Sequence, residues 1–173
     1  MLVVIKRIVD HIDSFSDRSG QVVSVLAYGM LASLLIEVLL RYIFNEPTIW
    51  AHEVGAYLFG AYFMLGGAYC LRHKGHVAVD ILYIRLSRRK QAVLDVITFS
   101  LFLSVCITLL WYGGVLAKDS WRIFEHSNST FGPPIYPIKT VIPIAGGLLL
   151  IQGLAKFVRD LVIVVTGKEL GEI

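Results

Sequence analysis

Charged residues are scarce in this chain. Asp, Glu, Lys and Arg make up 17% of its 173 residues, and 56% of the residues are hydrophobic. Soluble domains carry about 25% charged residues, so a chain this apolar is not a water-soluble domain. The mean hydropathy of +0.70 agrees and indicates a protein whose solvent is lipid. The 16 basic residues stand at the ends of apolar runs rather than along one face, which argues against a nucleic-acid partner.

Cysteine and histidine are also sparse. Cys70 and Cys106 lie in separate apolar runs without a CxxC motif, so packed thiols are the simpler interpretation, although a disulfide and a thiol oxidoreductase stay open. A membrane anchor subunit of a redox enzyme also stays open, but a haem inside a helical bundle needs histidine ligands there. All five histidines stand instead at or beyond the ends of the apolar runs: His11, His52, His73, His76 and His126.

Catalytic and cofactor motifs are missing as well. The sequence has no HExxH motif, no GxxxxGK[ST] loop and no credible Ser/His/Asp set. We therefore expect no enzyme, and no catalytic, cofactor-binding or metal site.

Long apolar runs are what the sequence does contain. A bilayer core about 30 Å thick needs roughly 20 apolar residues of helix to cross it. Four runs satisfy this, at about 21–44, 52–72, 91–117 and 137–156. We expect an all-α integral membrane protein with four transmembrane helices, forming a single membrane domain over residues 1–173.

Two further segments have the composition of surface helices. Residues 77–90 mix apolar side chains with charge and are too short to cross a bilayer, so they predict a short interfacial amphipathic helix. Arg85, Arg88 and Arg89 would lie among the lipid phosphates. Residues 1–20 lack a signal-peptide cleavage site, and they are either a helix on the membrane surface or a frayed polar terminus.

The distribution of Lys and Arg predicts the orientation. Twelve of them fall in the two chain ends and the connection after the second run, and four fall in the other connections or at their edges. Basic residues concentrate on the cytoplasmic side of membrane proteins. We expect a multi-pass protein of a bacterial inner membrane with both termini in the cytoplasm.

One pair of charges lies inside the first run. Glu37 and Arg41 are four residues apart and therefore share a helix face, where they can pair. Charge at membrane depth is costly, so the pair either neutralises itself within this chain or contacts another subunit or an ion path. Because Arg41 lies one turn nearer the predicted outer surface, its loss is expected to strand Glu37 at membrane depth.

The second run offers further candidate residues. Trp50 is placed as an interfacial anchor, and Glu53 lies near the positive end of the helix that follows. Gly60, Gly66 and Gly67 leave room for close helix contact, within this chain or with a partner. Four spans without a broken-helix repeat give no midplane substrate site, so a partner protein is expected.

An ordered set of residues resembles the small permease subunit of tripartite ATP-independent periplasmic (TRAP) transporters, the DctQ-like family. The set comprises Glu37-x3-Arg41-Tyr42-x-Phe44, Trp50-x2-Glu53-x3-Tyr57, Gly66 to Tyr69 with Arg72, and His76-Val77-x-Val79-Asp80. As the resemblance implies, the candidates for subunit-interface or structural roles are Glu37, Arg41, Trp50, Glu53, Gly60, Gly66, Gly67, Arg72, His76 and Asp80.

The resemblance also implies a function and partners. A soluble periplasmic binding protein would deliver an organic acid, of dicarboxylate or sialic acid type, to a membrane complex. A large subunit, expected as a separate chain, would move the substrate with sodium by an elevator motion. This chain would be the fixed scaffold beside it.

Overall fold

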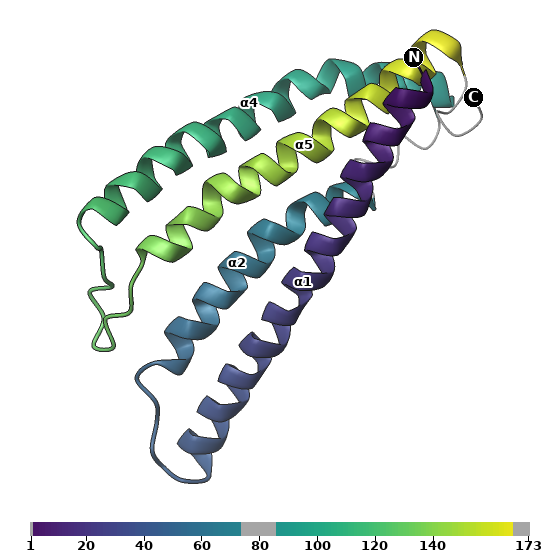
Figure 1. Cartoon of the computed structure of the whole chain (residues 1–173). Coiled ribbons are helices and arrows are strands. Elements are labelled where there is room, and N and C mark those ends of the chain that lie inside the picture. The colour runs from purple at the N-terminus through teal and green to yellow at the C-terminus, as the bar shows by residue number, and fades with distance from the viewer. Residues whose placement is uncertain (1, 74–85, 168–173) are drawn as a thin grey trace.

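The computed structural model describes residues 2–73 and 86–167, which form four α-helices. These are α1 (Leu2–Tyr42), α2 (Ala51–Arg72), α4 (Arg88–Arg122) and α5 (Tyr136–Thr166), shown in Figure 1. The predicted all-α class is confirmed. Three helices are long and apolar enough to cross a membrane, within 4–42, 51–72 and 88–122.

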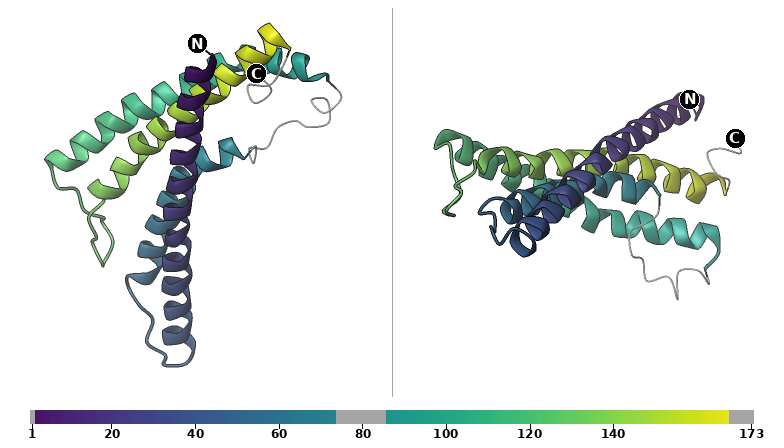
Figure 2. Two further views of the ribbon diagram at one scale, coloured as in Figure 1. Left: turned by 45° about the vertical axis from the view of Figure 1, so that its right-hand side comes forward. Right: turned by 90° about the horizontal axis from the view of Figure 1, so that it is seen from below.

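The helices form two antiparallel hairpins. One pairs α1 with α2 and the other pairs α4 with α5, and contacts between α2 and α5 hold the hairpins together. Figures 1 and 2 show the hairpins close together at the end that carries both chain termini and diverging toward the loops at 43–50 and 123–135. We call these two ends of the molecule the terminal end and the loop end.

Local sequence explains where the helices begin and end. Pro137 lies in the first turn of α5, where its missing N–H needs no partner. After α5, Gly167 takes a left-handed φ of 73°, and its N–H bonds the carbonyl of Ile163 to close the last turn. Asn45, with φ of 57°, turns the chain after α1.

The bounds of α2 are nearly those of the second predicted span, and α1, α4 and α5 each extend beyond the apolar run predicted for them. Residues 1–20 were expected either as a helix on the membrane surface or as a frayed polar terminus, whereas α1 runs unbroken from Leu2 through this region. With no proline before position 47, nothing in the sequence stops the helix there. Arg88 and Arg89 begin α4 rather than ending a separate interfacial helix, and the segment 77–85 lies outside the described residues.

Many of the buried positions are seven or fourteen residues apart along the helices. A seven-residue repeat keeps one narrow stripe of an α-helix facing its neighbour. Most of these residues are small, which lets helix backbones approach closely in lipid. The stripe consists of Val9, Ser16 and Val23 in α1, Ala61 and Ala68 in α2, Ala92, Cys106, Gly113 and Ser120 in α4, and Ala145 and Gln152 in α5.

Two glycines lie close to the neighbouring helix where α4 meets α5. A Cβ atom placed on Gly113 would lie 2.7 Å from Ile142 Cγ2, and one on Gly146 would lie 3.0 Å from Leu109 Cβ. Cys106 is buried on the same stripe, and both Cys106 and Cys70 are free thiols. Small residues therefore set the distance between these two helices.

Candidate subunit interface and its polar anchors

Glu37 organises the loop end of the first hairpin. Its carboxylate accepts hydrogen bonds from the Arg41 guanidinium, 2.8 Å from Nε, and from both the backbone N–H (3.0 Å) and the hydroxyl of Thr48. The Glu37 residue is 8% exposed, whereas the Arg41 side chain is 54% exposed. The pair therefore forms within this chain. Thr48 is a second partner of Glu37 that the sequence did not indicate.

Glu53 connects the two hairpins at the loop end. Its carboxylate accepts hydrogen bonds from Tyr57 on the next turn (3.0 Å) and from the Ser129 hydroxyl in the 123–135 loop (2.6 Å). Trp50 directly precedes α2 and is half-buried. The position of Glu53 near the start of α2 was predicted, but its partner in the distant loop was not.

The 123–135 loop is held in place by a second ion pair. Lys139 on α5 donates to the Glu125 carboxylate, and the backbone N–H of Ile135 bonds the Glu125 carbonyl at 2.9 Å. The hydrogen bond from Lys139 lowers the pKa of Glu125 below its usual value. These contacts tie the start of the loop to its end and to α5, and Phe124 and Phe131 are exposed on it.

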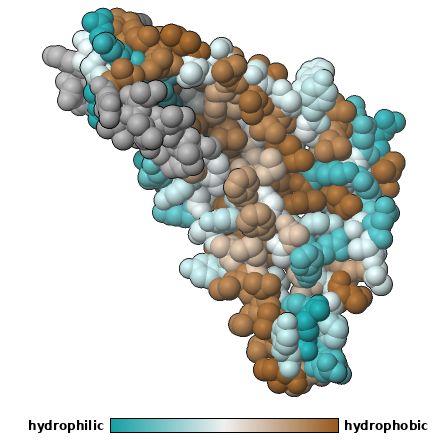
Figure 3. Space-filling view, turned by 180° about the vertical axis from the view of Figure 1, so that it is seen from behind, coloured by the Kyte–Doolittle hydropathy of each residue, from teal (hydrophilic) through white to brown (hydrophobic). Residues whose placement is uncertain are grey.

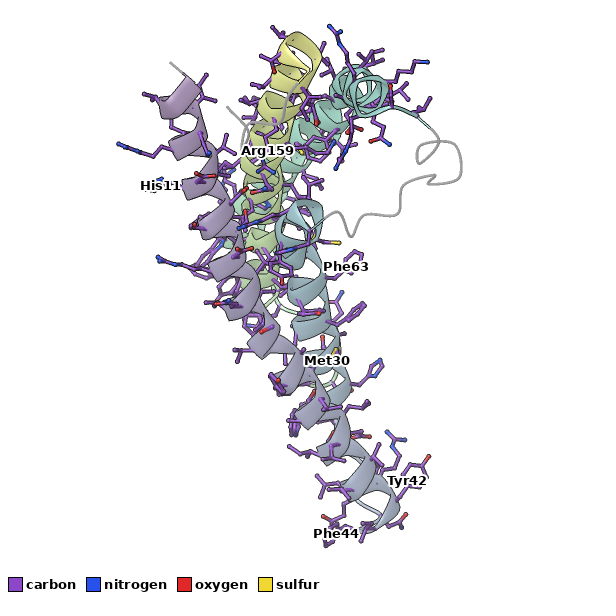
Figure 4. The ribbon with its side chains drawn as sticks, turned by 90° about the vertical axis from the view of Figure 1, so that its right-hand side faces the viewer. His11, Met30, Tyr42, Phe44, Phe63 and Arg159 are labelled. Atoms are coloured by element: carbon purple, nitrogen blue, oxygen red, sulfur yellow. The ribbon has the colours of Figure 1, made fainter. Side chains whose placement is uncertain are left out.

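A polar cluster joins three helices near the terminal end. Asp13 on α1 accepts hydrogen bonds from Gln152 (3.0 Å) and Arg159 (2.5 Å) on α5, and its backbone carbonyl accepts one from Arg72 of α2. Figure 4 shows Arg159 between α5 and α1. We name Asp13, Ser16, Asp17, Arg72, His73, Gln152 and Arg159 the terminal cluster.

The rest of the terminal cluster completes the connection. Asp17 pairs with Arg72 and lies 3.1 Å from His73 Nε2, while the buried Ser16 hydroxyl donates to Gln152 Oε1 at 2.7 Å. Of the cluster, only Arg72 was a candidate from sequence. The sequence feature that could have indicated the others is a polar residue on the stripe of small residues: Ser16 and Gln152 both occupy such positions and are buried.

The candidate glycines fall into two groups. A Cβ on Gly67 would lie 3.4 Å from Leu149 Cδ2, so this glycine packs against α5. Gly60 and Gly66 have nothing within 4 Å of a Cβ position in the part of the chain that the structure describes. These two do not serve packing between the described helices, and they leave small, open positions on α2.

Large apolar side chains cover the outside of the molecule. Figure 3 shows much of this surface from behind. Phe63 is 71% exposed and points away from α1, as Figure 4 shows. Such a surface needs lipid or protein against it. Other exposed side chains include Tyr28, Leu31 and Leu34 of α1, Phe59 of α2, and Leu101, Trp111 and Tyr112 of α4.

The remaining candidates are placed only in part. His76, Asp80 and Arg85 lie outside the described residues. Arg88 and Arg89 are exposed in the first turn of α4, and Arg89 Nε donates to the Val164 carbonyl of α5 at 3.1 Å. Arg89 thus joins the ends of the second hairpin.

Comparison with known proteins identifies the family. Residues 30–162 match the DctQ component of tripartite ATP-independent periplasmic transporters. A protein of Haemophilus influenzae named as a TRAP transporter small permease is 30% identical over 120 residues, covering 69% of this chain and 70% of its own length. The C4-dicarboxylate TRAP transporter small permease protein DctQ of Pseudomonas aeruginosa is 29% identical over 125 residues, covering 67% of this chain and 56% of its own length.

A third relative is a longer permease chain. The isethionate TRAP transporter permease protein DctMQ of Oleidesulfovibrio alaskensis is 29% identical over 146 residues, which are 78% of this chain and 23% of that protein. Such a fused chain indicates a large membrane partner in this family. None of these matches supports the redox-anchor alternative. The chain is a multi-pass membrane protein, not an enzyme, and it belongs to the DctQ family of small permease subunits of TRAP transporters.

Proposed function

We propose that this chain is the stationary scaffold of a TRAP transporter in a bacterial inner membrane. It holds a large, separate elevator-type subunit that imports an organic acid with sodium, and a periplasmic binding protein delivers the substrate. The observation that carries the proposal is the open surface on α2, where Gly60 and Gly66 stand beside exposed aromatic rings in a member of this family. Small residues of this kind let helices of two subunits approach closely.

The substrate class follows from the relatives by analogy. Two of them are named for isethionate and for C4-dicarboxylates, which are small organic anions. We assign this transporter an organic acid of the dicarboxylate or sialic acid type. The binding protein, which delivers the substrate, selects the individual acid.

Reconstitution tests the scaffold function. We expect sodium-driven uptake by vesicles that contain both membrane subunits and the binding protein, and none by vesicles that contain this chain alone. Omitting only this chain is expected to abolish uptake while the large subunit stays folded. Full uptake by the large subunit and binding protein without this chain would contradict the proposal.

The topology has four spans, with α5 as the fourth, and both termini in the cytoplasm. Basic residues where α2 ends and α4 begins, Arg72, Arg88 and Arg89, support this orientation. A reporter active only in the periplasm is expected to work when fused after Asn128 and to fail after Arg89 or at Ile173. Activity in the reverse pattern would overturn the orientation.

A further inference from the structure

An open pocket lies at the start of α4, where Arg89 contacts the end of α5. Its volume is about 520 Å³, and it is lined by Leu86, Ser87, Arg89, Lys90, Val93 and Leu94. Apolar side chains and two cations therefore meet at one place. The buried stripe of α4 uses other positions, beginning with Ala92, so the pocket calls for an explanation of its own.

The two cations of the pocket are not neutralised by a neighbouring carboxylate. Arg89 Nε donates to the Val164 carbonyl at 3.1 Å, which is an uncharged acceptor and takes only one of the five N–H groups of the guanidinium. Lys90 is exposed, and neither side chain forms an ion pair within residues 2–73 and 86–167. The two positive charges together suit an anion.

The pocket stands at the level of the lipid headgroups. Lys90 precedes the start of the charge-free run at Val96 by six residues, or about 9 Å of helix. The hydrocarbon core is about 30 Å thick and has a polar headgroup layer of several ångströms on each side. With Val96 at the edge of the hydrocarbon, Lys90 lies in the headgroup layer, where lipid phosphates are the abundant anions.

An exposed apolar row leads from the pocket into the hydrocarbon. Its members follow Lys90 at intervals of three or four residues and therefore share one face of α4. They are Leu94, Ile97, Leu101 and Val105, with exposed fractions of 42%, 63%, 70% and 58%. At about 1.5 Å per residue the row is about 17 Å long, close to the depth of about 15 Å of one leaflet. An acyl chain attached to a phosphate in the pocket has a continuous path along this row.

We propose that this pocket binds phosphatidylglycerol, an anionic phospholipid. Its phosphate lies between Arg89 and Lys90, and one acyl chain runs past Val93 and Leu94 onto the exposed row. Phosphatidylethanolamine carries an ammonium group beside its phosphate, which the two cations repel. The headgroup with a net negative charge is therefore favoured, and the path for the acyl chain distinguishes a lipid from a free phosphate.

Lipid retention measures this selectivity. The full chain is placed in nanodiscs of equal parts phosphatidylglycerol and phosphatidylethanolamine, released, and its bound lipids are counted by native mass spectrometry. We expect the wild-type chain to retain phosphatidylglycerol in excess. Lys90→Gln should lower the ratio about fivefold, the effect of removing one cation next to an anionic headgroup. Val93→Trp, which fills the pocket without changing charge, should lower the ratio as well.

Arg7→Gln is the matched control for Lys90→Gln. It removes one positive charge at an exposed position near the start of α1, at the same end of the molecule but outside the pocket. We expect the wild-type ratio of lipids in this variant. An equal fall in both variants would show that net charge selects the lipid and the pocket does not, and the proposal would be wrong.

Two further results would overturn the proposal. One is an unchanged ratio in both pocket variants, each first shown to unfold at the wild-type temperature. The other is stabilisation of the wild-type chain by soluble glycerol phosphate that equals stabilisation by phosphatidylglycerol, which would identify a free phosphate site. None of these readouts involves the large subunit, so failure here leaves the scaffold proposal standing.

Discussion

Replacing Gly146 with leucine is expected to separate α4 from α5 and to lower the free energy of unfolding by roughly 2–3 kcal/mol, since overpacking a close contact costs about 1–3 kcal/mol. A Cβ at this position would already lie 3.0 Å from Leu109 Cβ and 3.3 Å from the backbone nitrogen of Leu110. A backbone atom cannot move aside unless the whole helix moves. Thermal unfolding in one detergent, followed by circular dichroism, measures the loss.

Gly60→Leu is the matched control for Gly146→Leu. It makes the same change in a helix, but apart from its chain neighbours and the nearby backbone of α2 itself, no atom of the described residues lies within 4 Å of its Cβ position. We expect its unfolding temperature to stay near that of the wild type, and its co-purification with the large subunit to fall. If both variants destabilise the isolated chain equally, the open space at Gly60 does not accommodate the leucine, and the prediction is wrong.

Changing Asp13 to alanine is expected to weaken the joint between the hairpins. The change leaves Gln152 and Arg159 without the carboxylate that they share. Removing one partner of a buried charge pair costs roughly 3–5 kcal/mol. Because the Asp13 side chain keeps 17% exposure, we expect about half of this, roughly 2 kcal/mol, in the free energy of unfolding. Faster hydrogen exchange in the first half of α1 should accompany it.

Asp10→Ala serves as the control for this change. It removes the same charge one turn earlier on α1, at an exposed position. We expect it to alter neither the unfolding temperature nor the exchange of α1. If both variants behave alike, the net charge of α1 matters and the connection through Asp13 does not.

The all-α class could be predicted because lipid imposes it. An uninterrupted apolar run of about 20 residues has few structures open to it in a bilayer, so α2 was predicted to within one residue at its start. The start of α1 was not predicted, because the ends of an apolar run do not show where a helix ends once it extends outside the lipid. Apolar residues recur in 1–20 with the spacing of a surface helix. This spacing does not show whether such a helix is continuous with the membrane helix that follows it.

Polar contacts were predicted only where the two side chains are close in sequence. Glu37 and Arg41 are one turn apart, so their pairing follows from helix geometry. Asp13 and Gln152 are 139 residues apart, and their contact depends on how the hairpins pack. The seven-residue recurrence of small and polar residues could have indicated which faces meet, but not which helix meets which.

The helices differ in length, and this has a consequence for how the protein fits a bilayer. At a rise of about 1.5 Å per residue, the 22 residues of α2 span about 33 Å, close to the hydrocarbon thickness, whereas the 41 residues of α1 span about 62 Å. A membrane of different thickness meets its hydrophobic mismatch first at α2, which has no surplus length, while α1 can tilt or project. Among the described helices α2 has the least surplus length, so we expect it to constrain the depth of the protein and the level of Gly60 and Gly66 in the membrane.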